Sequence, residues 1–299
     1  MRIKAPSSTA NLGPGFDIFG LALDAYYDEV EVSIIDHDII IESYDNIPLD
    51  VKSNSAGLAA TKLLNDFKIS DGLKIKIKKG IPTGYGLGSS AASAAAVIRA
   101  LDKLYELELT NEELVKYAAI GEQASAGSIH YDNVAASMLG GFVIVRSEPF
   151  RVVRIEPPEM RFCIAIPKID VPNMKTQVAR SVIPNDIPLK SMVSNLSNAS
   201  MIVAGFSMKD IRLITESIRD VIIEPARARL IKGYEKVKKN ALEAGALAVT
   251  ISGAGPSLIA FLDGREEAVR RAMLDGFKED GIDAHTILCN IDRKGTSII

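Results

Sequence analysis

The residues best suited to carry chemistry form a glycine-rich stretch in the first third of the chain. Gly84, Gly86 and Gly88 alternate, and two serines and two alanines follow them directly. Glycine tolerates positive φ angles and lets a ligand approach the main chain. The alanine-rich segment 89–105 has a helical pattern, and the unpaired amides at a helix N-terminus favour anions. The pattern therefore predicts a phosphate-binding loop made of Pro82, Thr83, Gly84, Tyr85, Gly86, Leu87, Gly88, Ser89, Ser90, Ala91 and Ala92.

Ser89 or Ser90 would add a hydroxyl to the phosphate or to Mg²⁺ in such a loop. The alternative is a strand-to-helix turn with a serine cap, although capping alone does not explain three alternating glycines with tandem serines. The loop is no Walker A motif, because no Gly-Lys-Ser/Thr follows, and it lacks the Gly-x-Gly-x-x-Gly spacing of dinucleotide-binding folds. The catalytic motifs of protein kinases are missing as well.

Two further motifs lie near the ends of the chain. The first contains Asn11-Leu12-Gly13-Pro14-Gly15-Phe16-Asp17 and the second contains Ser252-Gly253-Ala254-Gly255-Pro256. With the glycine loop, they resemble the three motifs of the galactokinase, homoserine kinase, mevalonate kinase and phosphomevalonate kinase superfamily (GHMP kinases). The form of segment 11–17, the run Gly121-Glu122 with segment 130–135, and segment 223–227 resemble the homoserine kinase branch. Tyr85 departs from the pattern, because the family usually has a small residue there.

The resemblance implies an α+β, two-domain GHMP kinase fold. It implies an N-terminal ATP-binding domain, ribosomal-protein-S5-like, over residues 1–157 and a C-terminal ferredoxin-like domain over 158–299. The pair Pro157-Pro158 independently indicates a boundary at this position. We expect ATP and substrate to lie in the cleft between the domains.

The resemblance also implies a reaction, the transfer of the γ-phosphoryl group of ATP, with Mg²⁺, to the side-chain hydroxyl of L-homoserine. The product would be O-phospho-L-homoserine, in threonine biosynthesis, and the enzyme would be cytoplasmic and a homodimer. One rival is another GHMP kinase that acts on mevalonate or a shikimate-like alcohol. The second rival is a non-catalytic ATP-binding protein on the same scaffold, against which the intact loop, Ser90 and Glu122 argue.

Individual roles follow from the same resemblance. It implies magnesium contacts from Ser90 and Glu122 and an ATP contact from Asn54. From the sequence alone, Ser90 is equally a helix cap, Asn54 a helix cap as well, and Glu122 a solvated carboxylate. For the substrate and the catalytic step, it implies Asn11, Asp17, His130, Asp132, Asn133, Arg180, Arg227 and Gly253.

The substrate is a zwitterion, whose carboxylate suits the fork of an arginine and whose ammonium suits carboxylate or amide oxygens. Arg180 and Arg227 match the first need, although from the sequence alone a surface ion pair is the plainer interpretation of Arg227. For His130, the plainer interpretation is a structural role. Among the catalytic candidates Asn133, Arg227 and Asp132, only Asp132 could be a base. Homoserine kinases are thought to work without one, through stabilisation of the transition state.

Composition excludes several other classes. The chain has 299 residues, 47% of them hydrophobic, a net charge of −3 and no Trp, so neither a basic face nor a base-stacking surface for nucleic acid is expected. Cys163 and Cys289 are expected to be reduced, buried thiols. The N-terminus has no signal-peptide core. The uncharged stretch 244–262 contains glycines and a proline, which predict two strands and a loop rather than a membrane span.

The elements that must position these residues follow from periodicity. We expect strands at 1–5, 28–35, 39–41, 73–78, 140–145, 151–155, 161–166, 246–251, 258–262 and 284–288. We expect helices at 53–67, 89–105, 110–123, 188–217, 225–244 and 266–278. Asn54 or Ser53 would cap the first helix, and Thr110 and Glu113 would form a capping box.

Overall fold

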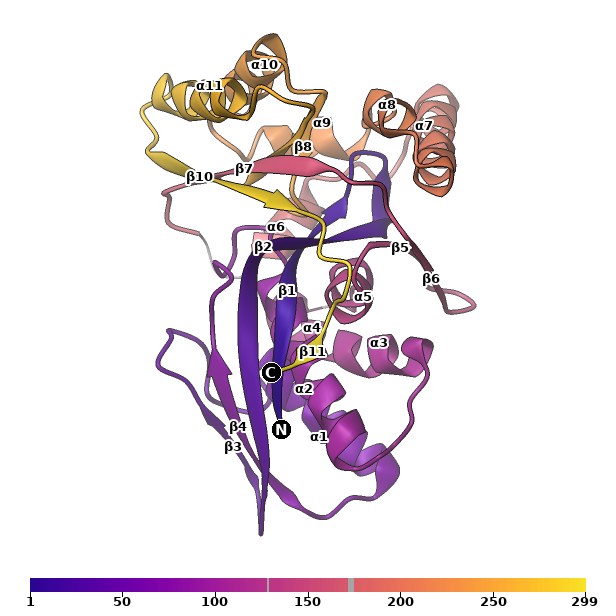
Figure 1. Ribbon diagram of the computed structural model, residues 1–299, viewed down its shortest axis with the longest axis vertical. Helices are drawn as coiled ribbons and strands as arrows, with labels where there is room; N and C mark the ends of the chain where they lie inside the picture. Colours follow the sequence, from indigo (N-terminus) through magenta and orange to yellow (C-terminus); the bar gives the residue numbers. More distant parts are fainter. Residues whose placement is uncertain (128, 172–174) are drawn as a thin grey trace.

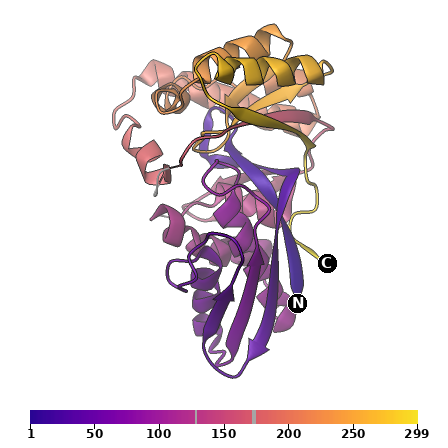
Figure 2. The same cartoon turned by 90° about the vertical axis from the view of Figure 1, so that its left-hand side faces the viewer.

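The computed structural model describes residues 1–127, 129–171 and 175–299. Within them, the strands form one sheet of seven strands and one of four. Figures 1 and 2 show the four-stranded sheet above the larger one, with helices α10 (Tyr234–Glu243) and α11 (Glu266–Lys278) covering its upper face. This is the α+β architecture that the sequence predicts.

The first sheet has the order β11-β1-β2-β4-β3, and β5 pairs with β2 and β6. The strands β3 and β4 run parallel, and the other recorded pairs are antiparallel. Helices α2 and α5 pack on β1 and β2. The bounds are β1 (Arg2–Asn11), β2 (Gly15–Ile35), β3 (Ile39–Glu42), β4 (Gly72–Lys78), β5 (Phe142–Arg146), β6 (Arg151–Ile155), β11 (Ser297–Ile298), α1 (Ser55–Phe67), α2 (Ser89–Leu104), α3 (Asn111–Ile120), α4 (Glu122–Ala126) and α5 (Asp132–Leu139).

The second sheet is antiparallel, with the order β10-β7-β9-β8. Helices α10 and α11 pack on one another, and α11 packs on β7 and β10. The chain passes from the first sheet to the second between Ile155 and Arg161, and the domain division at 157 stays a prediction. The bounds are β7 (Arg161–Pro167), β8 (Ala248–Ile251), β9 (Leu258–Leu262), β10 (Ala284–Asn290), α6 (Lys175–Ser181), α7 (Leu189–Met208), α8 (Ile211–Glu216) and α9 (Ile223–Ala228).

Local signals for two helices are confirmed. Asn54 caps α1, because its side chain accepts hydrogen bonds from the amides of Ala56 and Gly57. Thr110 and Glu113 form the expected capping box at the start of α3. These bonds satisfy amides that a helix leaves unpaired at its N-terminus.

Two expectations about element length are wrong. The strands expected at 1–5 and 28–35 are parts of β1 and of the 21-residue β2, which pair along most of their length. The helices expected at 188–217 and 225–244 are each divided. Lys209, at φ 59°, ends α7, and Gly233, at φ 88°, precedes α10. A left-handed residue cannot continue a right-handed helix.

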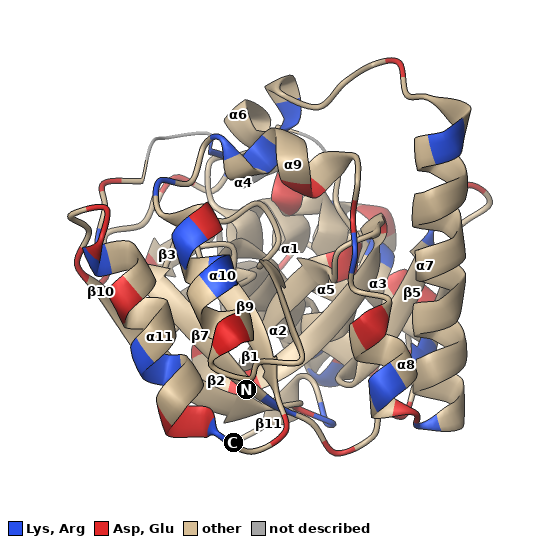
Figure 3. Ribbon diagram, turned by 90° about the horizontal axis from the view of Figure 1, so that it is seen from above, with Lys and Arg blue, Asp and Glu red and all other residues tan. Residues whose placement is uncertain are grey.

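Two other expectations, about the cysteines and about segment 244–262, are confirmed. Cys163 and Cys289 are buried and form no disulfide in the described residues. Segment 244–262 contains β8, a loop and β9. In the described residues no helix has the length and hydrophobicity to cross a bilayer. Figure 3 shows basic and acidic residues interspersed along the ribbon in this view.

Candidate active site

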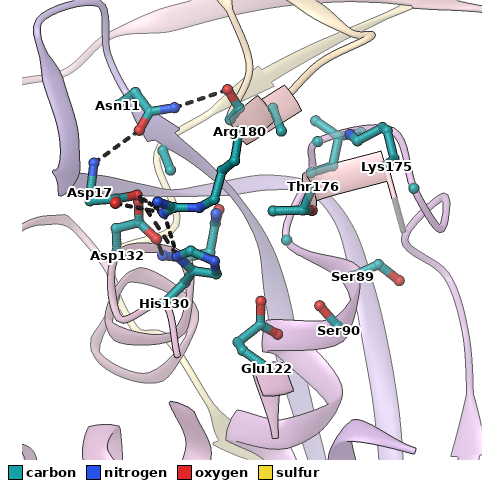
Figure 4. Close-up of a pocket in the computed structure, with 18 of the residues that line it drawn as sticks. Asn11, Asp17, Ser89, Ser90, Glu122, His130, Asp132, Lys175, Thr176 and Arg180 are labelled. Atoms are coloured by element: carbon teal, nitrogen blue, oxygen red, sulfur yellow. Dashed lines mark hydrogen bonds and ion pairs between the residues drawn. The ribbon is translucent and has the colours of Figure 1, made fainter. Parts of the chain in front are cut away.

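One cleft gathers residues from both ends of the chain, and we call it the cleft (Figure 4). All the residues to which the resemblance assigned a substrate, catalytic or metal role line it, together with much of the glycine loop. Its lining residues are Ala10, Asn11, Phe16, Asp17, Thr83, Gly84, Gly86, Leu87, Gly88, Ser89, Ser90, Glu122, His130, Asp132, Asn133, Val171, Lys175, Thr176, Arg180, Arg227, Gly253 and Ala254.

The glycine loop leads directly into α2. Gly84, Gly86 and Gly88 have φ angles of 86°, 78° and 71°, which other residues rarely adopt. Gly88 occupies the N-cap position, and among the described residues no side-chain cap is recorded for this helix. The hydroxyl of Ser89 instead donates to the carbonyl of Ile81, at 3.1 Å. The serine-cap alternative is therefore wrong, and the first amides of this 16-residue helix are left for another acceptor.

A buried ion pair behind the loop holds its shape. The ammonium of Lys79 pairs with Asp28, and it also donates to the carbonyl of Ser89 at 2.8 Å. Asp28 accepts from the amides of Gly80 and Ile81, each at 3.0 Å. Its carboxylate is fully buried, so removing either charge would leave the other one buried without an ion-pair partner. Sequence reasoning missed this pair, because Asp28 lies on β2, Lys79 directly follows β4, and the two share no motif.

The three motifs meet at the hydroxyl of Ser252. It lies 2.8 Å from the carbonyl of Gly86, to which it donates, and 2.9 Å from the hydroxyl of Thr9. A Cβ atom on Gly86 would lie 2.2 Å from the carbonyl oxygen of Ser252 and 2.7 Å from that of Gly255. Both neighbours are main-chain atoms, so Gly86 has no room for a side chain.

Ser90 and Glu122, the two residues implied to bind magnesium, come together where α2 and α4 begin. Burial raises the pKa of Glu122, while a hydrogen bond from Ser90 and the positive charge of Lys79 oppose the rise. A carboxylate beside a hydroxyl is the donor set that Mg²⁺ accepts from a protein, with phosphate and water completing its shell. The interpretation of Glu122 as a solvated carboxylate is wrong, because it is buried.

On another side of the cleft, Asp17 and Arg180 form an ion pair (Figure 4). The Nη2 group of Arg180 lies 2.7 and 2.6 Å from the two carboxylate oxygens of Asp17 and 2.9 Å from Nδ1 of His130. Burial and the charge of Arg180 lower the pKa of His130, while Asp17 acts in the opposite direction. A neutral ring can accept a hydrogen bond at Nδ1. In the described residues, the buried Nε of Arg180 has no hydrogen-bond partner.

Arg227 is buried and is no surface residue, so the plainer interpretation of it is wrong. Its Nε and Nη1 donate to the carbonyls of Ala179 and Gly253, at 3.2 and 3.1 Å. Burial lowers its pKa, and in the described part of the chain no carboxylate lies within 4.0 Å of its guanidinium. The amide of Asn11 also donates to the Gly253 carbonyl, at 2.9 Å. The Gly253 carbonyl thus accepts hydrogen bonds both from Asn11 of the first motif and from Arg227.

Asp132 and Asn133 begin α5 at the cleft. Asp132 is buried, and desolvation followed by the charge of Asp17 raises its pKa to about 7, although the amide of Asn133 donates to it at 2.7 Å. The side-chain oxygen of Asn133 accepts from the hydroxyl of Ser8, at 2.9 Å. A carboxyl group with a pKa near neutrality can both give up and accept a proton at physiological pH, so Asp132 is a candidate for proton exchange.

Four members of the predicted loop and Asn54 do not line the cleft. Asn54 is the cap of α1, and its amide donates to the carbonyl of Pro48 at 2.7 Å, so its role as an ATP contact stays a prediction. Tyr85 points its hydroxyl at the carbonyl of Ile169, at 2.9 Å. The other loop residues outside the lining are Pro82, Ala91 and Ala92.

Comparisons with known proteins agree with this architecture. The family models of the GHMP kinase N-terminal and C-terminal domains match residues 54–141 and 192–279. A homoserine kinase from Thermoplasma volcanium is 43% identical over 268 residues, 89% of this chain and 86% of that protein. One from Pyrobaculum neutrophilum is 40% identical over 94% of this chain and 95% of that protein.

Solved structures give the same result. The crystal structure of homoserine kinase from Cytophaga hutchinsonii has a TM-score of 0.92 at 35% identity, and covers 100% of this chain and 97% of that chain. Mevalonate kinase of L. major, in complex with R-mevalonate, has a TM-score of 0.68 at 18% identity over 96% of this chain and 95% of that chain, which shows the shared fold alone. The chain therefore belongs to the GHMP kinases, in their homoserine kinase branch, and uses ATP.

The packing of Gly86 generates a first prediction. Gly86→Ala would place its Cβ atom 2.2 Å from the Ser252 carbonyl oxygen at a φ of 78°. We expect a destabilisation of more than about 1–2 kcal/mol, the usual cost of left-handed backbone, and ATP binding at least about tenfold weaker. Thermal unfolding and calorimetric titration with ATP measure the two effects.

Gly264→Ala is the matched control, because Gly264 has a φ of 75° and nothing within 4 Å of its added Cβ atom. It carries the backbone cost without the clash and should bind ATP normally. Equal melting temperatures and equal ATP affinities in the two variants would show that the contact with Ser252 is unimportant.

Proposed function

We propose that this protein transfers the γ-phosphoryl group of ATP to the side-chain hydroxyl of L-homoserine, forming O-phospho-L-homoserine in threonine biosynthesis. The observation that carries the proposal is the ion pair of Asp17 and Arg180 in the same cleft as the glycine loop. The relatives named above are homoserine kinases, which supports the same acceptor.

The pair is complementary to an amino acid. A substrate with adjacent ammonium and carboxylate groups replaces the internal partners of both side chains: its ammonium takes the place of Arg180 beside Asp17, and its carboxylate the place of Asp17 beside Arg180. Arg180 also has its buried Nε donor to offer, and Arg227 faces no carboxylate within 4.0 Å among the described residues. Arginine forks bind carboxylates with two hydrogen bonds, so two arginines suit one carboxylate here.

The nucleotide phosphates would lie at the amides of the glycine loop and the N-terminus of α2. Ser90 and Glu122 would hold Mg²⁺ there, and the ion would neutralise charge on the phosphates. The raised pKa of Glu122 fits a carboxylate that is buried for a cation.

Glu122→Gln preserves shape and removes the charge. We expect the Mg²⁺ concentration that gives half-maximal turnover to be at least about tenfold higher than in wild type, because a charged oxygen ligand is lost. A titration of kcat against Mg²⁺ at saturating ATP and homoserine is the measurement. An unchanged Mg²⁺ dependence in the folded variant would remove Glu122 from the metal site.

Acceptor specificity tests the proposed function. We expect wild type to prefer homoserine to its deaminated analogue 4-hydroxybutyrate and to mevalonate, because only homoserine satisfies the Asp17 carboxylate with an ammonium. Asp17→Asn should remove on the order of 2–5 kcal/mol of binding to the ammonium, which corresponds to a kcat/KM for homoserine lower by about thirty-fold or more. The preference for homoserine over 4-hydroxybutyrate should become smaller as a result. The measurement is kcat/KM for the three alcohols, from coupled ADP release.

Asp17 has a φ of 58°, and asparagine accepts this left-handed conformation as readily as aspartate does. The backbone should therefore survive the change. Asp36→Asn, at an exposed position between β2 and β3, is the control with the same change of charge. If wild type has the same kcat/KM for homoserine as for either other alcohol, the assignment of homoserine as the acceptor is contradicted. Membership of the GHMP kinases would then be all that remains.

We propose that Asp132 is not an essential base, because a hydroxyl proton can leave late in a loose transition state. An essential base contributes about 10²–10⁴-fold, so Asp132→Asn should lower kcat by less than about 100-fold. With its raised pKa, Asp132 is protonated below about pH 7 and charged above it.

The pH dependence provides a second test of the same residue. If its charged form were required as a base, kcat would fall about tenfold for each pH unit below 7, and the fall would vanish in Asp132→Asn. We expect a shallower profile in wild type. A steep limb near pH 7, with a loss of 100-fold or more in Asp132→Asn at little changed KM, would establish the base instead.

Three expectations stay predictions: the cytoplasmic location, the homodimer, and the lack of a nucleic-acid or membrane partner.

A further inference from the structure

Lys175 is a charged residue of the cleft that neither the motifs nor the proposed mechanism uses. It is the first residue of α6, and its Nζ donates to the carbonyl of Gly255. In the described part of the chain, no carboxylate lies within 4.0 Å of this ammonium. A buried or half-buried lysine normally pairs with an acid. Lys175 has no such partner among the described residues, so an anionic ligand would supply the missing negative charge.

The ammonium of Lys175 lies beside the glycine loop, at one edge of the cleft. The Gly255 carbonyl that it contacts packs against Gly86 of the glycine loop, at 2.7 Å from an added Cβ atom there. The positive charge of Arg227, which also lines the cleft, lowers the pKa of Lys175. Figure 4 shows Lys175 and Thr176 at one edge of the cleft, above Ser89 and Ser90.

We propose that the Lys175 ammonium binds the terminal phosphoryl group of ATP and stabilises its charge during transfer. This inference rests on the proposed function, which places the phosphates at the glycine loop and the acceptor at Arg227. An ammonium that lies beside the glycine loop and lines the same cleft can reach the phosphoryl group while it is transferred to the acceptor.

The chemistry leaves Lys175 unchanged. The bond between the γ-phosphorus and the bridging oxygen breaks, and that oxygen leaves on ADP. A bond forms between the γ-phosphorus and the homoserine oxygen, whose proton passes to a phosphoryl oxygen of the product. Throughout, Lys175 donates hydrogen bonds to phosphoryl oxygens and keeps its proton. Such a contact is strongest where negative charge is spread over those oxygens.

The electrostatics of the free site agree with this role. Desolvation, and secondarily the charge of Arg227, lower the pKa of Lys175 to about 7. A bound phosphate favours the charged form and raises the pKa again. ATP affinity should therefore be constant below about pH 7 and fall as the pH rises above it, and binding at pH 8 should take up a proton. The terminal phosphate itself is already ionised at that pH.

The experiment is isothermal titration with the β,γ-imido analogue of ATP and Mg²⁺ at pH 8, in two buffers of different ionisation enthalpy. Wild type should take up most of one proton. Lys175→Met should bind more weakly and take up almost none, and should lower kcat on the order of 10²-fold at little changed KM for homoserine. Lys175→Arg, which stays charged, should recover much of the affinity and kcat without proton uptake.

Lys168→Met is the matched control, because Lys168 is an exposed lysine seven positions earlier and outside the cleft. It should behave as wild type. Wild-type affinity, proton uptake and kcat in folded Lys175→Met would overturn the inference while leaving the kinase function intact. A wild-type enzyme that takes up the proton but does not phosphorylate homoserine would contradict the proposed acceptor and leave the phosphate contact standing.

Discussion

The hydroxyl of Ser252 joins three segments of the chain that are far apart in sequence. It lies 2.9 Å from Thr9 at the end of β1 and 2.8 Å from the carbonyl of Gly86 in the glycine loop. Gly86 packs this closely on the main chain of Ser252 and Gly255 only because it has no side chain. The positions of the phosphate loop, of Asn11 and of the Gly253 carbonyl all depend on this junction, since the motifs that carry them meet there.

The charges that line the cleft share one property. Apart from the Asp17–Arg180 pair, the buried charged groups are shifted toward their neutral forms, chiefly by desolvation. The protein thus buries acids and bases without fully compensating them, which costs stability unless a ligand supplies the missing charge. A metal ion, a phosphate and a zwitterion would each supply part of it. The groups with shifted pKa values are Glu122, Asp132, Lys175 and Arg227.

Sequence reasoning succeeded where the signal is local. The cap of α1, the capping box of α3 and the glycine loop each lie within a few consecutive residues, and the structure has all three. It failed on the length of β2 and on the division between α9 and α10. It also failed on the division between α7 and α8, because a left-handed lysine such as Lys209 has no compositional mark. Long-range pairs were also beyond its reach. Asp28 and Lys79 are 51 positions apart, and Asp17 and Arg180 are 163 apart, so only the fold reveals that they touch.

In the proposed function, an amino-acid zwitterion replaces the internal pair of Asp17 and Arg180, and the choice of acceptor depends on this exchange. A crystal structure of the complex with homoserine and a non-hydrolysable ATP analogue tests this claim directly. We predict that the ammonium of homoserine contacts Asp17, that its carboxylate contacts Arg180 and Arg227, and that the two Nη2 contacts of 2.7 and 2.6 Å are lost. Homoserine bound elsewhere, with the Asp17–Arg180 pair unbroken, would contradict the account.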